Sequence, residues 1–157
     1  NVNFLLPAVP HLLPLIQSLV AGSGVTILDQ PDDLIPALQT SDAMIATSGT
    51  ITLQAALCGT VGVTCYRTGA VSGFIGRRPV DLNKVILPNA ILGRPIYPFY
   101  FQEAANGKTL AAATLDCLDD GNAKCSARQA AIELKSLLTG GAKSFDELVV
   151  SALTTRF

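Results

Sequence analysis

Residues 41–54 read Ser-Asp-Ala-Met-Ile-Ala-Thr-Ser-Gly-Thr-Ile-Thr-Leu-Gln, and this stretch decides the fold of the chain. Residues 43–46 form an apolar run of strand length, residues 47–50 form a polar turn with a glycine, and residues 51–57 favour a helix. The first N–H groups of a helix lack intrahelical acceptors, and the helix dipole adds partial positive charge there, so such a loop suits a phosphate group. Because Ser or Thr before a helix most often serves only as a cap, the loop by itself indicates an anion site weakly.

Outward from this stretch, apolar runs of strand length alternate with helical patterns. Such alternation implies parallel strands joined by right-handed crossovers. The sequence therefore predicts an α/β fold, a Rossmann-like parallel sheet flanked by helices, with extra C-terminal helices. The predicted strands are residues 3–7, 25–28, 43–46, 63–66 and 84–87. The predicted helices are residues 11–21, 32–39, 51–57, 71–78, 106–118 and 123–138, with a loop at 88–97 and a last helix opened by a capping box of Ser144 and Glu147.

The composition narrows the class of protein. At 157 residues the chain has the size of one domain with a real core, so we predict a single lobe spanning residues 1–157. Hydrophobic residues make up 49% and charged residues 15%, which fits parallel strands buried on both faces. A net charge of −1 gives no field that attracts nucleic acid. No apolar run approaches the roughly 20 residues that a transmembrane helix needs.

Cysteine and histidine are sparse. The four cysteines show no C-x-x-C spacing and His11 is the single histidine, so a zinc site has little to be built from. We expect buried, reduced thiols in a cytosolic protein at Cys58, Cys65, Cys117 and Cys125. The sequence has neither a signal peptide nor an initiator Met and starts in a strand pattern, so we expect a piece of a longer protein.

Polar residues follow three of the predicted strands. In open parallel sheets, ligands bind at the carboxyl ends of the strands. Convergence of three strand ends favours a binding site at this edge over a plain helix cap. The residues expected there are Ser48, Gly49, Thr50, Tyr66, Arg67, Pro88 and Asn89.

The same residues belong to an ordered set of motifs: Ser41-Asp-Ala-x-x-Ala-x-Ser-Gly-Thr50, Tyr66-Arg67, Leu87-Pro-Asn89, Gly93-Arg94 and Gln102. In order and spacing, the set resembles lipid-A-disaccharide synthase, from about residue 4 to about residue 118. Ser-Gly-Thr is common by itself, whereas the spacing from Leu-Pro-Asn to Gln is specific. The resemblance implies a glycosyltransferase of the two-lobed GT-B type, of which this chain is the C-terminal lobe that holds the UDP part of the donor.

The resemblance also implies a reaction. Members of that family transfer 2,3-diacylglucosamine from its UDP donor to 2,3-diacylglucosamine 1-phosphate, which yields the β-1,6-linked disaccharide of lipid A and releases UDP. No metal and no other cofactor is implied. The partners implied are the UDP-diacylglucosamine donor and the lipid acceptor, and the location is the cytoplasm, with peripheral contact to the inner membrane of a Gram-negative bacterium.

The resemblance assigns roles residue by residue. Ser48, Gly49 and Thr50 would present donors to the diphosphate, where fixed dipoles stabilise the charge that gathers on departing UDP. Arg67 is the nearest cation for a phosphate, with a plain surface arginine as the alternative. Asn89 would place the donor from the neighbouring strand end. Gln102 would bond the sugar or uridine, with a cap on the following helix as the alternative.

The chain departs from the family at three places. Gln54 stands where the family has Glu, and an amide accepts through one oxygen where a carboxylate accepts from both ribose hydroxyls. Phe99 stands where the family has another Glu. The strand and Gly-Ser-Arg loop that open the family's lobe would precede Asn1. The base is expected in the other lobe, so we predict no catalytic residue in this chain, and His11 matches no catalytic position.

Two alternatives remain open from the sequence. One is another GT-B enzyme that uses UDP-GlcNAc, such as a peptidoglycan GlcNAc transferase or a 2-epimerase. The other is a binding module that has lost turnover, which Gln54 and Phe99 support.

Residues 73–78 carry an apolar pair and two arginines that would touch anionic lipid, or else pack inward. The helices at residues 123–157 are expected to pack on the lobe or on a partner, which predicts a homo-oligomer or contact with the other lobe.

Overall fold

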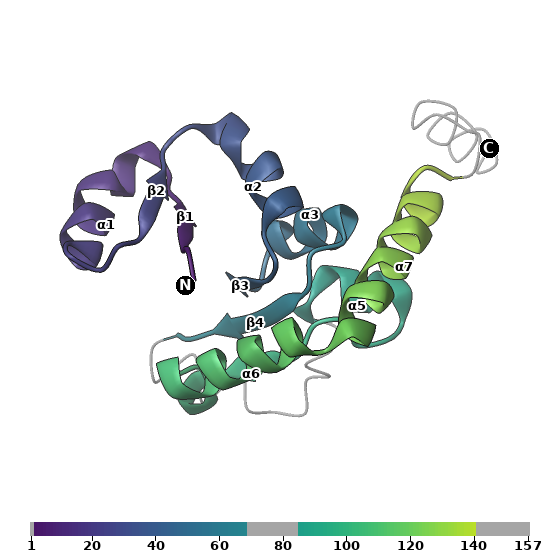
Figure 1. Ribbon diagram of the computed structural model, residues 1–157. Coiled ribbons are helices and arrows are strands. Elements are labelled where there is room, and N and C mark those ends of the chain that lie inside the picture. Colours follow the sequence, from purple (N-terminus) through teal and green to yellow (C-terminus); the bar gives the residue numbers. More distant parts are fainter. Residues whose placement is uncertain (1, 69–84, 141–157) are drawn as a thin grey trace. The chain divides into compact units, whose positions relative to one another are not determined.

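The computed structural model describes residues 2–68 and 85–140, in which helices alternate with parallel strands (Figure 1). The chain divides into two compact units, Asn1–Ser41 and Asp42–Phe157, and each unit holds its own sheet. The strand pairs among the described residues are all parallel, which confirms the predicted α/β class. The helix predicted at residues 71–78, the lipid-contact segment at residues 73–78 and the capping box of Ser144 and Glu147 lie outside the described residues.

The first unit is a small β-α-β arrangement. Strand β1 (Leu5–Pro7) pairs with β2 (Thr26–Leu28), and the connection between them contains a 3-10 turn, η1 (Pro10–Leu12), and helix α1 (Leu13–Val20). A second 3-10 turn, η2 (Pro31–Asp33), leads into α2 (Leu34–Thr40). Backbone bonds secure both ends of the strand pair, from Thr26 N to Phe4 O at 2.9 Å and from Ala8 N to Leu28 O at 2.8 Å. The predicted strands at residues 3–7 and 25–28 and helix at 11–21 are confirmed within a few residues.

The second unit is built on a sheet of order β3-β4-β5, formed by β3 (Met44–Thr47), β4 (Gly62–Tyr66) and β5 (Phe99–Phe101). Strands β3 and β4 come close together at Gly62, which pairs with Met44. A Cβ added at Gly62 would lie 2.2 Å from the carbonyl oxygen of Met44, and the φ of Gly62 is +156°. Only glycine therefore allows this pairing.

Helices cover this sheet. Helix α3 (Thr50–Cys58) packs on β3 and on α7 (Gly121–Leu138), while α6 (Gly107–Asp119) contacts β3 and β4. Figure 1 shows α3 and α6 on opposite sides of β4. Small and branched residues form the core between α3 and α7: Ala55, Ala130 and Leu134 are fully buried. Burial of this face accounts for the position of α7, whose outer residue Ile132 is 63% exposed.

The prediction of a fifth strand at residues 84–87 is wrong at 85–87, the part of it that the structure describes. Residues 87–92 form helix α5 (Leu87–Leu92), which also replaces part of the predicted loop at residues 88–97, and the last strand of the sheet is β5. Pro88 sits in the first turn of α5, where proline is favoured, and Gly93 ends the helix in the left-handed conformation at φ 66°. A short apolar run does not by itself distinguish a strand from a helix start.

Candidate functional site

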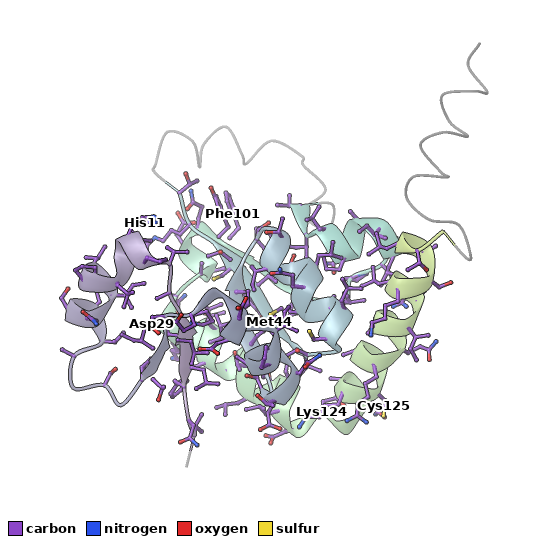
Figure 2. All side chains as sticks on the ribbon, turned by 90° about the horizontal axis from the view of Figure 1, so that it is seen from above. His11, Asp29, Met44, Phe101, Lys124 and Cys125 are labelled. Carbon is purple, nitrogen blue, oxygen red and sulfur yellow. The ribbon has the colours of Figure 1, made fainter. Side chains whose placement is uncertain are left out.

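The carboxyl ends of three neighbouring strands form one edge of the β3–β4–β5 sheet. Strand β3 ends at Thr47, β4 at Tyr66 and β5 at Phe101, which is labelled in Figure 2. Thr47 pairs with Cys65, and Tyr66 pairs with Phe101, so the three ends lie at similar heights. The residues that follow are Ser48, Arg67 and Gln102, and this edge is where parallel α/β sheets bind ligands.

The Ser48–Gly49–Thr50 loop joins β3 to α3. Ser48 is half-buried: its N–H donates to Cys65 O at 3.2 Å, and its hydroxyl donates to Val85 O at 3.0 Å. Gly49 occupies the N-cap position with φ 155°, and no side chain caps the helix. The capping alternative is therefore wrong for this loop.

The start of α3 retains donors for a ligand. The first bond at this end runs from Thr52 N to Gly49 O at 3.1 Å, so the N–H groups of Thr50 and Ile51 precede the helical ladder. A Cβ added at Gly49 would meet nothing within 4 Å, so the space beside the backbone is open. Thr50 itself is exposed. These groups lie at the positive end of the helix dipole, where an anion is stabilised.

Two further predicted site residues reach solvent. Gln54 lies on α3 about one turn after Thr50 and is exposed. Arg67 directly follows β4, and its side chain is also exposed. Among residues 2–68 and 85–140, no ion pair involves Arg67. A cation without a carboxylate partner at this edge is able to meet a phosphate oxygen.

Asn89 does not lie at a strand end, so its predicted placement is wrong. It belongs to α5 and is 2% exposed. Its Oδ1 accepts from the N–H groups of Ile96 at 3.0 Å and Tyr97 at 3.1 Å, and its Nδ2 donates to Tyr97 O at 3.0 Å. The observed contacts of Asn89 therefore shape the segment that leads into β5.

Gln102 takes the place at the edge that Asn89 was expected to hold. It follows Phe101 directly, is 8% exposed, and accepts the N–H of Thr68 on Oε1 at 3.1 Å. It does not cap the following helix: Asn106 caps α6 by accepting from Thr109 N at 3.0 Å. Thr68 was missed by the sequence analysis, because it takes part through its backbone and no residue pattern announces such a contact.

Among residues 2–68 and 85–140, the remaining titratable groups form no second site. His11 lies in η1 and is exposed. Within the part of the chain that the structure describes, no three metal-ligating side chains gather, and no helix is long and apolar enough to cross a membrane. Burial raises the pKa of the half-buried Cys58, Cys65 and Cys117 thiols. Cys125 is exposed beside Lys124 near the start of α7 (Figure 2), so the prediction of a buried thiol is wrong there.

Comparison with known proteins identifies relatives. A family model described as lipid-A-disaccharide synthetase matches residues 18–152. Proteins named lipid-A-disaccharide synthase are similar to this chain. The one from Bradyrhizobium diazoefficiens is 32% identical over 144 residues, which is 90% of this chain and 37% of the relative. That from Rhodopseudomonas palustris is 38% identical over 128 residues, 80% of this chain and 32% of the relative.

A third relative, from Paraburkholderia xenovorans, is 34% identical over 160 residues, 99% of this chain and 41% of the relative. The match confirms the resemblance predicted from the ordered motifs. The chain spans only 37% and 36% of the lengths of the first two curated relatives, so it corresponds to a part of such a protein.

Proposed function

Because this chain belongs to the lipid-A-disaccharide synthetase family, we propose that it is the donor-binding part of a glycosyltransferase that makes the lipid A disaccharide. The donor is UDP-2,3-diacylglucosamine and the acceptor is 2,3-diacylglucosamine 1-phosphate. The observation that carries the proposal is the edge of the β3–β4–β5 sheet, where the open start of α3 and the exposed Arg67 follow neighbouring strands. A diphosphate needs this combination of fixed N–H donors and one cation.

The proposed chemistry is the displacement of UDP. The acceptor hydroxyl forms a bond to the anomeric carbon of the donor while the bond from that carbon to the diphosphate oxygen breaks, and UDP leaves with the electron pair. The N–H groups of Thr50 and Ile51 and the guanidinium of Arg67 would stabilise the charge that develops on the leaving diphosphate. The hydroxyl proton goes to a base outside this chain, so the 157-residue piece by itself is expected to show no turnover.

Calorimetry on the intact gene product tests the proposal. UDP and UDP-GlcNAc are titrated separately, with ADP as the control ligand that has the same diphosphate but another base. We expect both uridine ligands to bind, and ADP to bind more weakly. The absence of binding by both uridine ligands would end the proposal. Transferase activity in the isolated 157-residue piece would refute the assignment of the base to the rest of the protein.

A second candidate is a binding module without turnover, and Gln54 favours it. This side chain is exposed one turn into α3, where the family's Glu would accept from both ribose hydroxyls. The two candidates differ in one measurement, because the module would bind UDP while the intact protein transfers no sugar from the donor to the acceptor.

Location and assembly are part of the proposal. The substrates are lipids, so we propose a cytoplasmic protein that contacts the inner membrane peripherally and associates with a second copy or with the rest of the protein. Apolar residues such as Ile132 and Leu137 are exposed on α7, at 63% and 55%, and support an association at this helix. If the membrane contact is peripheral, a salt wash should release the protein from membranes. If the protein associates with a second copy, light scattering of the purified protein should give a mass above that of one chain.

A further inference from the structure

The side chain of Gln102 spans two neighbouring strand ends. Strands β4 and β5 are adjacent and parallel, with Tyr66 opposite Phe101. Gln102 follows β5, and its Oε1 accepts the N–H of Thr68, two residues beyond the end of β4, at 3.1 Å. The bond joins residues 34 positions apart, and Gln102 is only 8% exposed. Thr68 itself is half-buried, and the buried side chain of Gln102 supplies the acceptor for its N–H.

The backbone of Gln102 is held in an unfavourable conformation. Its φ is 53°, and it is the only non-glycine residue with positive φ in the segments 2–68 and 85–140. Side chains with a Cβ avoid this region, and a residue persists there where its surroundings determine the conformation. Gly or Asn would suit the backbone better, but Gly has no acceptor and Asn is shorter by one methylene. The position therefore retains a residue long enough to reach Thr68.

We infer that Gln102 is a positioning residue, which fixes Arg67 at the carboxyl edge through the backbone of Thr68. Arg67 lies between two anchored neighbours: Tyr66 is paired to Phe101 within the sheet, and the N–H of Thr68 is held by Gln102. The exposed guanidinium thus extends from a backbone fixed on both sides, and less conformational entropy is lost when it meets an anion. This inference rests on the proposed function, because it takes the anion to be the diphosphate of a UDP donor.

The inference differs from direct contact between Gln102 and the donor. If Gln102 bonded the sugar or uridine itself, its removal would weaken UDP-sugar binding whether or not Arg67 were present. If it acts through Arg67, its removal matters only while Arg67 is present. A double-mutant cycle separates these cases.

The experiment uses the intact gene product with Gln102→Met, Arg67→Met and the double variant, and measures UDP and UDP-GlcNAc affinity by calorimetry. We expect Gln102→Met to lower the affinity for both ligands by about five-fold in the wild-type background. In the Arg67→Met background the same substitution should lower it by less than about two-fold. Gln129→Met, at an exposed position on α7, is the matched control and should leave both affinities unchanged. Equal losses in the two backgrounds would overturn the inference.

A second variant and a second measurement keep the test decisive. Gln102→Asn relieves the backbone strain, but its side chain is too short to reach the N–H of Thr68. It should therefore also lower the affinity for UDP, even if Gln102→Met fails to fold. Amide hydrogen exchange of the unliganded protein should become faster at Thr68 in both variants. Unchanged exchange at Thr68 would refute the inference while leaving the proposed function intact. Failure of the wild-type protein to bind UDP, with normal exchange at Thr68, would instead refute the proposed function.

Discussion

At the amino end of the β3–β4–β5 sheet, polar side chains are buried and bonded to backbone, whereas at the carboxyl end several reach solvent. Ahead of β4 and β5, the hydroxyl of Tyr97 donates to Thr60 O at 2.6 Å, and Asn89 bonds the residues that lead into β5. Burial raises the pKa of Tyr97 above its ordinary value, so the hydroxyl remains a donor. At the other end, Thr50, Gln54 and Arg67 are exposed.

The difference shows that residue type does not separate scaffold from site in this protein. Asn89 and Gln102 are both buried amides, and both use side-chain oxygen to hold backbone N–H groups. Only Gln102 does so at the edge where a ligand would bind. If this comparison is right, substitutions at the amino end change stability, and substitutions at the carboxyl end change affinity for UDP.

The largest effect is expected at the amino end of β4, from Gly62→Ala. The new Cβ would lie 2.2 Å from Met44 O on a backbone with φ +156°, so β3 and β4 cannot keep their pairing. We expect a loss of about 3–5 kcal/mol in the free energy of unfolding. Denaturant unfolding measures it. The control is Gly107→Ala in α6, where an added Cβ meets nothing within 4 Å, and the change should stay within about 0.5 kcal/mol.

A smaller loss of stability is expected from Asn89→Leu. The substitution leaves the N–H groups of Ile96 and Tyr97 and the carbonyl of Tyr97 without a partner, at a cost of about 3 kcal/mol in the free energy of unfolding. The exposed Asn122 provides the control Asn122→Leu, which should be nearly neutral. The affinity of folded protein for UDP should be unchanged. Weaker UDP binding with unchanged stability would instead indicate that Asn89 contacts the donor.

At the carboxyl end, Arg67→Met should weaken UDP binding by about ten-fold, because one charge-assisted contact to phosphate is lost. The free energy of unfolding should hardly change, since the side chain is exposed. The salt dependence of UDP binding should decrease as well. Arg128→Met on α7 is the matched control, and calorimetry at two salt concentrations is the measurement. Equal effects of the two substitutions on UDP affinity would show that Arg67 does not contact the ligand.

The smallest effect is expected from Gln54→Glu, which restores the family's residue on α3. If the ribose contact exists, UDP affinity should increase by about 1 kcal/mol, or roughly five-fold, because a carboxylate accepts from both hydroxyls. Gln129→Glu adds the same charge at an exposed position on α7 and should have no effect. Unchanged affinity in Gln54→Glu would favour the binding module without turnover.

Signals from nearby residues were sufficient to predict most of the helices and strands. The strand predicted at residues 43–46 and the helix at 51–57 appear as Met44–Thr47 and Thr50–Cys58. Gly59 closes that helix in the left-handed conformation at φ 74°, as a C-terminal glycine is expected to do. The helix predicted at residues 106–118 begins after the Asn106 cap. In each case the information lies within a few residues of the element, and the ordered motifs were sufficient to predict the family.

The sequence by itself thus determined the α/β class, the parallel strands, the loop before α3 and the family. Tertiary structure alone decided that residues 87–92 form a helix, that Asn89 holds the approach to β5, and that Gln102 reaches Thr68. The physical reason is the range of the interactions. A cap or a turn depends on adjacent residues, whereas a buried amide takes its role from backbone groups that the fold brings to it, 34 positions away for Gln102.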